Sequence, residues 1–115
     1  MSNSDHLEVR EETTDDGTVL IPVGDIDLSR APALRQHLSR VLGGGADRII
    51  IDLSEVPYMD SSGVATFVEA MQLARKRGSK LILCGLQERV RGIFEIARLD
   101  MVFTIFASRD EARSA

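Results

Sequence analysis

Residues 51–64 read Ile-Asp-Leu-Ser-Glu-Val-Pro-Tyr-Met-Asp-Ser-Ser-Gly-Val, and they join two regular elements. Just before them, Ile49 and Ile50 open an apolar run between charged residues, which is typical of a central strand buried on both faces. From Ser61 to Gly78, apolar residues recur at helical spacing. The apolar face of this predicted helix is Val64, Phe67, Val68, Met71 and Ala74. The stretch therefore predicts the strand–loop–helix connection of an α/β domain.

Towards the N-terminus, the pattern predicts a hairpin followed by a helix. Residues 7–13 alternate weakly, Asp15-Asp16-Gly17 favours a turn, and residues 19–23 form the second arm. Pro22 removes one donor, so either it lies at an unpaired position or this strand is short. Ser29 is the expected N-cap of the helix, with Pro32 in its first turn. The apolar face is Ala31, Leu34, Leu38, Val41 and Leu42, and three glycines at 43–45 end the helix.

Towards the C-terminus, the same alternation of strand and helix continues. Residues 81–84 predict a second buried strand. Val90, Ile93, Phe94 and Ala97 predict a third helix, which either extends to Met101 or ends early at Leu99-Asp100. Residues 103–106 predict a last strand, and Ser108 with Glu111 predicts a short, fraying terminal helix. The chain is thus expected to be one α/β domain over residues 1–115, with an ordered core near 7–107. A hairpin leads into a mixed, mainly parallel sheet with about four helices.

The composition limits the class of function. The 115 residues are 43% hydrophobic and 28% charged, which suits a folded domain, and the net charge of −4 argues against binding nucleic acid. No apolar run approaches the ~20 residues that cross a bilayer, and the N-terminus lacks the features of a secretory signal. The single cysteine, Cys84, lies in an apolar run and is expected to be buried. We therefore expect a cytoplasmic protein that binds another protein and is monomeric when free.

The start of the helix at Ser61 is the candidate site. A helix N-terminus presents unpaired N–H groups and the positive end of the macrodipole, which favour an anion. No acidic residue follows within the first turn, and Gly63 is expected to let a partner or a phosphate approach closely. A phosphate on Ser61 would add about −1.5 to −2 charges there. The simpler interpretation is that Asp60 or Ser61 only caps the helix.

The motif at residues 52–64 resembles the segment around the phosphorylated serine of STAS-domain (sulfate transporter and anti-sigma-factor antagonist) proteins. Two further blocks, residues 23–27 and 90–106, resemble other parts of the same family, so the resemblance runs from about residue 7 to 112. It implies an anti-sigma-factor antagonist, which is not an enzyme and needs no cofactor or metal. Pro22 and Ala97 are small departures from the family pattern.

The resemblance also implies a partner-switching mechanism. The unphosphorylated domain would bind an anti-sigma factor that is also a serine kinase, and a sigma factor would be released. Phosphorylation at Ser61 would switch binding off, and a serine phosphatase acting on phospho-Ser61 would restore it. The expected partner-binding residues are Asp27, Asp60, Ser61, Ser62 and Gly63.

Three alternatives remain open at this point. A receiver domain would use Asp52 as a phosphate acceptor, but the sequence lacks the acidic pair and the late lysine that a receiver needs. A serine hydrolase would need a nucleophile motif and a suitable histidine, and neither serine lies in Gly-x-Ser-x-Gly. The third alternative keeps the fold and drops the switch: a constitutive STAS scaffold subunit of a lipid-transport or stress-signalling complex.

Overall fold

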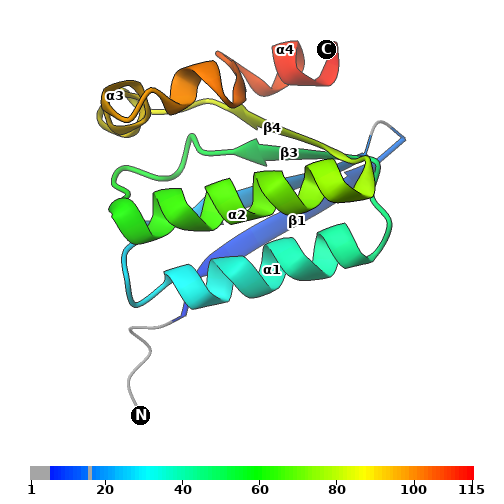
Figure 1. Ribbon diagram of the computed structural model, residues 1–115, viewed down its shortest axis with the longest axis horizontal. Helices are drawn as coiled ribbons and strands as arrows, with labels where there is room; N and C mark the ends of the chain where they lie inside the picture. Colours follow the sequence, from blue (N-terminus) through cyan, green and yellow to red (C-terminus); the bar gives the residue numbers. More distant parts are fainter. Residues whose placement is uncertain (1–5, 16) are drawn as a thin grey trace.

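A computed structural model describes residues 6–15 and 17–115, which form a five-stranded sheet with helices on both faces (Figure 1). The strands are β1 (Glu8–Thr14), β2 (Gly17–Val23), β3 (Arg48–Asp52), β4 (Lys80–Cys84) and β5 (Thr104–Phe106). The helices are α1 (Ala31–Gly43), α2 (Ser61–Arg77), α3 (Glu88–Ile96), the 3-10 helix η1 (Leu99–Met101) and α4 (Arg109–Arg113). Strand order follows chain order, with β1 antiparallel to β2 and the other neighbours parallel. The predicted mixed, mainly parallel sheet with about four helices is confirmed.

One face of the sheet carries the larger core, under α1 and α2, which lie side by side (Figure 1). Successive strand residues point to opposite faces. In β3, Ile49 and Ile51 therefore pack with α1 and α2, while Ile50 packs on the other face. All five residues predicted for the apolar face of α1 are buried, and on α2 only Val68 is partly exposed. Helical spacing in the sequence thus predicted both buried helix faces.

The opposite face is covered by α4, which lies across β3, β4 and β5 (Figure 1). Ala112 of this helix is fully buried against the strands. Arg109 pairs with Asp52 at 3.0 Å, and Arg48 donates a hydrogen bond to the carbonyl oxygen of Ala112. The expected ordered core ended near residue 107 and left this helix out. In the structure, two arginines and a buried alanine hold it against the sheet.

The third predicted helix ends earlier than its apolar spacing indicated. α3 stops at Ile96, and Arg98 then adopts a left-handed backbone conformation with φ of 59°. Because this conformation ends a right-handed helix, Met101 falls in η1 and is 80% exposed. The early end that Leu99-Asp100 indicated is confirmed, and Met101 does not belong to the apolar face of α3.

The N-terminal hairpin pairs β1 with β2 in the antiparallel register that joins Thr14 to Gly17. Two predictions concern residues outside the described part of the chain: the turn that includes Asp16, and the absence of a secretory signal, which rested on residues 1–5. Gly17 has a φ of 133°, and a Cβ added to it would lie 2.3 Å from the Arg48 carbonyl oxygen, so this position requires glycine. Pro22 stands opposite Val9 in the β1–β2 register and lies beyond the part of β2 that pairs with β3, so it is paired on one side only.

Candidate functional site

Two loops that follow neighbouring strands lie side by side at one edge of the sheet. Residues 24–28 follow β2, and residues 53–60 follow β3. The N–H of Ile26 donates to the carbonyl oxygen of Tyr58 (3.0 Å), and the N–H of Asp60 donates to the carbonyl oxygen of Ile26 (3.1 Å). The two sequence blocks that carried the predicted site residues therefore form one surface.

The side chain of Asp60 is the N-cap of α2 and also holds the neighbouring loop. Its Oδ1 accepts the N–H groups of Ser62 (2.9 Å) and Gly63 (3.3 Å), and its Oδ2 accepts the N–H of Leu28 (3.1 Å). Because no acidic residue follows Ser61 within the first turn, these helix amides were expected to be open to a phosphate. That expectation is wrong, because the residue before Ser61 already occupies the amides, as aspartate at an N-cap does.

Ser61, Ser62 and Gly63 differ in what they present to solvent. Ser61 is exposed, and its hydroxyl makes no hydrogen bond to another described residue. Ser62 is partly buried, and its carbonyl oxygen accepts the Thr66 hydroxyl (2.9 Å). Gly63 is buried, and a Cβ added to it would lie 2.6 Å from Cγ of Met59. The missing side chain of Gly63 therefore makes room for the protein's own core rather than for an approaching partner.

Asp27 is partly exposed and organises the start of α1. Its Oδ1 accepts the N–H of Ser29 (3.1 Å), the Ser29 hydroxyl (2.7 Å) and the N–H of Arg30 (3.2 Å). The hydrogen bond from the Ser29 hydroxyl is the main reason that the pKa of Asp27 lies below its ordinary value of 3.8. α1 begins at Ala31, so the predicted N-cap role of Ser29 is wrong. Arg30 is the N-cap residue and its side chain makes no capping hydrogen bond, while the Asp27 carboxylate accepts the N–H groups of the two residues just before the helix, Ser29 and Arg30.

Three side chains on this surface were not predicted from the sequence. Leu28 is 73% exposed beside Asp27, and Tyr58 is 36% exposed. The guanidinium of Arg89, in the first turn of α3, lies 5.9 Å from the centroid of the Tyr58 ring. Large apolar side chains that solvent reaches next to polar groups are typical of surfaces that bind proteins. The sequence could have indicated that Leu28 is exposed, because Leu28 is an apolar residue in a predicted loop and belongs to none of the predicted apolar helix or strand faces.

Asp52, on which the receiver interpretation depends, is engaged by internal contacts. Its Oδ1 accepts the N–H of Ser54 (3.0 Å), and its Oδ2 accepts two N–H groups of Arg109 (3.0 and 3.2 Å). Burial acts to raise the pKa of Asp52, but the hydrogen bonds from Ser54 and the charge of Arg109 outweigh it, so the pKa lies below its ordinary value. The structure therefore gives Asp52 an ion pair across the sheet rather than an open place for a phosphoryl group.

Other kinds of site find little support in the part of the chain that the structure describes. Burial raises the pKa of Cys84 to about 11, so its thiol stays protonated near neutral pH. Within residues 6–15 and 17–115, no three His, Cys, Asp or Glu side chains gather where they could hold a metal ion. Over the same residues, no helix combines the length and the apolar character needed to span a membrane.

Comparisons with known proteins agree with this geometry. The family model described as the STAS domain matches residues 8–112. An anti-sigma-B factor antagonist of Listeria monocytogenes is 36% identical over 99 residues, which cover 86% of this chain and 86% of that protein. The crystal structure of an anti-sigma factor antagonist from Mycobacterium paratuberculosis is similar with a TM-score of 0.83 at 25% identity, covering 99% of this chain and 97% of that one.

The fold is also shared with a phosphorylated protein. The phosphorylated form of the Bacillus cell fate determinant SpoIIAA is similar with a TM-score of 0.70 at 23% identity, over 93% of this chain and 96% of that one. The family match spans nearly the whole chain, and the Listeria relative covers most of it. This chain therefore belongs to the STAS-domain family of anti-sigma-factor antagonists, which are binding regulators and not enzymes.

Proposed function

We propose that the chain is an anti-sigma-factor antagonist that works by partner switching. In its unphosphorylated form it binds an anti-sigma factor that is also a serine kinase, and a sigma factor is released. The kinase phosphorylates Ser61, binding is lost, and a serine phosphatase restores the free hydroxyl. The names of the relatives support the general role. The observation that carries the choice of acceptor is the exposed hydroxyl of Ser61 at the start of α2. The proposal includes a cytoplasmic location.

The proposed contact surface combines apolar and acidic groups. Leu28 supplies an exposed apolar side chain, and the backbone at its N–H is held by Asp60. Asp27, Ser61 and Ser62 lie on the same two segments, at the ends of β2 and β3. A partner that covers Leu28 therefore also covers the Ser61 hydroxyl. Gly63 is buried below this surface, and because it has no side chain the first turn of α2 can pack closely on the core.

Charge supplies the reason why a phosphate would weaken binding. Asp60 already places a carboxylate at the start of α2, and among the described residues no cation pairs with it. A phosphate on Ser61 adds about −1.5 to −2 charges beside it. Like charges about 4 Å apart repel by roughly 1–4 kcal/mol at effective dielectric constants between 80 and 20. Because ~1.4 kcal/mol is a factor of ten, covering both groups with a partner should lower affinity by orders of magnitude.

The acceptor is tested with purified chain, cognate anti-sigma factor and ATP. We expect Ser61→Ala to abolish phosphorylation while the protein still binds the anti-sigma factor. The matched control, Ser62→Ala, should be labelled like the unmodified chain. Phosphopeptide mapping identifies the labelled residue, and label on Ser62 or Asp52 would contradict the assignment. If the chain binds its partner but is never labelled, the constitutive scaffold is the correct function.

A further inference from the structure

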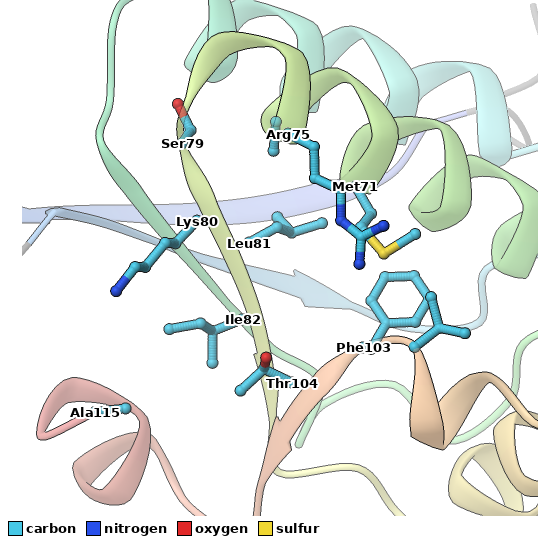
Figure 2. Close-up of a pocket in the computed structure, with 11 residues that line it drawn as sticks. Met71, Arg75, Ser79, Lys80, Leu81, Ile82, Phe103, Thr104 and Ala115 are labelled. Atoms are coloured by element: carbon cyan, nitrogen blue, oxygen red, sulfur yellow. The ribbon is translucent and has the colours of Figure 1, made fainter.

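A second concave surface lies at the other end of α2. Its volume is about 330 Å³, and it is bounded by the last turns of α2, the start of β4 and residues 102–104 (Figure 2). β4 begins at Lys80, but its pairing with β5 begins only at Ile82. Since a helix rises about 1.5 Å per residue, Arg75 lies roughly 20 Å along the axis from Ser61. This cavity is therefore separate from the proposed partner surface.

The floor of the cavity is apolar. Met71, Leu81 and Phe103 point into it from three different elements (Figure 2). Phe103 is held in place by an edge-to-face contact with Phe94, with ring centroids 5.6 Å apart. At the rim, Val102 is 41% exposed. Met71 and Leu81 are each 8% exposed and Phe103 is 5% exposed, so a bound apolar group would gain about 25 cal/mol per Å² mainly by covering Val102.

The charge at the mouth of the cavity is positive. Arg75 extends from α2 over Met71 and Phe103, and Lys80 lies on the other side of β4 (Figure 2). Among the described residues, neither Arg75 nor Lys80 takes part in an ion pair, whereas Arg35 on α1 is paired with Glu69 at 2.9 Å. Of the described residues that line the cavity, none has a carboxylate side chain; Ala115 also lines it, and its carbonyl oxygen accepts a hydrogen bond from Arg48. In a chain with a net charge of −4, such a cavity selects for an anion.

We propose that this cavity binds a small amphipathic anion, with one carboxylate or phosphate head and a short apolar tail. The tail lies on Met71, Leu81 and Phe103, and the guanidinium of Arg75 binds the head through two parallel N–H donors. The Ser79 hydroxyl cannot donate to the anionic head, because it already donates to the carbonyl oxygen of Ala46 (2.7 Å). Binding of the head therefore depends on Arg75 and Lys80. The volume lies at the lower end of the range for small-molecule sites, about 300–1,000 Å³, which limits the tail to roughly eight carbons.

The test uses octanoate as the probe and amide NMR shifts of the full chain as the readout. We expect saturable shifts at Leu81 and Thr104, and at least a tenfold weaker Kd for Arg75→Gln. Lys76→Gln is the matched control, because Lys76 is an exposed neighbour that does not line the cavity. The control and Ser61→Ala should bind octanoate like the unmodified chain.

Two further ligands separate the contributions of head and tail. Octyl phosphate should bind within a few-fold of octanoate, whereas 1-octanol and acetate should each bind at least tenfold more weakly. The proposal is overturned if octanoate gives no saturable shifts, if Arg75→Gln binds it unchanged, or if the shifts gather around Ser61. None of these outcomes depends on the anti-sigma factor, so this site and the proposed switch can fail independently.

Discussion

Asp52 and Asp60 lie at the two ends of the connection between β3 and α2, yet their carboxylates have opposite kinds of partner. Asp52 pairs with the guanidinium of Arg109 at 3.0 Å and is 7% exposed. Asp60 accepts the backbone N–H groups of Ser62, Gly63 and Leu28. One negative charge is balanced by a cation, the other only by partial charges of the backbone. The pair of Asp52 with Arg109 holds α4 against the sheet. The backbone partners of Asp60 leave its negative charge at the surface, where a phosphate on Ser61 would add to it.

The largest expected effect comes from adding charge at the Asp60 end. Phosphate on Ser61 should lower affinity for the anti-sigma factor at least 100-fold, because two like charges must be covered together. The free energy of unfolding should change by less than about 1 kcal/mol, since attraction to the helix dipole and repulsion from Asp60 oppose each other. Calorimetric titration and urea unfolding of the phosphorylated chain measure the two quantities.

Ser61→Asp is the matched variant for this prediction. It carries less charge than phosphate on a shorter side chain, so it should weaken binding only in part. If phosphorylation lowers the melting temperature in proportion to the loss of binding, the switch acts by unfolding and the electrostatic explanation is wrong.

Asp27 provides a second measure of the same acidic surface. Asp27→Lys should weaken binding by about 1–3 kcal/mol, a typical cost of reversing a charge at an interface. Because Asp27 also accepts the N–H groups of Ser29 and Arg30, the lysine variant should lose about 0.5–2 kcal/mol of stability as well. Surface plasmon resonance and urea unfolding separate these two losses.

Asp27→Asn is the control, since it keeps an acceptor oxygen and removes only the charge. The free energy of unfolding of Asp27→Asn should be close to that of the unmodified chain. Its affinity for the anti-sigma factor should lie between those of the unmodified chain and Asp27→Lys. Binding of Asp27→Lys at full affinity would remove Asp27 from the contact surface.

The fold could be predicted from the sequence because its signals are periodic and local. Isoleucines at 49–51 predicted the central strand, and helical spacing predicted the buried faces of α1 and α2. Glycine at position 78 ends α2 with a φ of 74°, as expected of a helix followed by glycine. Such signals depend on neighbours a few residues apart, and the sequence contains them in full.

The details of the site depend on contacts between residues far apart in the chain. The bond from Leu28 to Asp60 spans 32 positions, and the pair of Asp52 with Arg109 spans 57. No periodicity indicates such pairs, so the second role of Asp60 and the anchoring of α4 were missed. The N-cap of α2 was a different case. This cap is local, and the sequence pattern predicted Asp60 as one possible cap. The consequence, that Asp60 occupies the helix amides expected to be open to a phosphate, was not predicted.

The charge of Asp52 should contribute more to stability than the charge of Asp60. Asp52→Asn should cost roughly 1–2 kcal/mol, because hydrogen bonds to a charged group are lost at a partly exposed pair. The folded-state pKa of Asp52 lies below its ordinary value of 3.8. Its contribution is therefore present above pH 3.8 and is lost as the pH falls through the lower folded-state pKa.

Urea unfolding at a series of pH values measures this contribution. The difference in unfolding free energy between the unmodified chain and Asp52→Asn should be constant near neutral pH and shrink below pH 3.8. Arg109→Gln removes the other partner, and the double variant should be less destabilised than the sum of the two. Additive losses, or a difference that grows in acid, would show that the pair does not anchor α4.

The smallest effect is expected from Asp60→Asn. An asparagine caps a helix about as well as an aspartate, so the N–H groups of Ser62 and Gly63 keep their acceptor. The amide NH₂ group replaces Oδ2 and cannot accept the N–H of Leu28, so one hydrogen bond is lost, worth about 0.5–1 kcal/mol. Asp60→Ala removes all three bonds and should cost about 1–2 kcal/mol more. Urea unfolding ranks these variants, and hydrogen exchange at the Leu28 amide reports the lost bond directly. If Asp60→Asn is as destabilising as Asp52→Asn, Asp60 depends on its charge and not on its oxygens, and the contrast between the two aspartates is wrong.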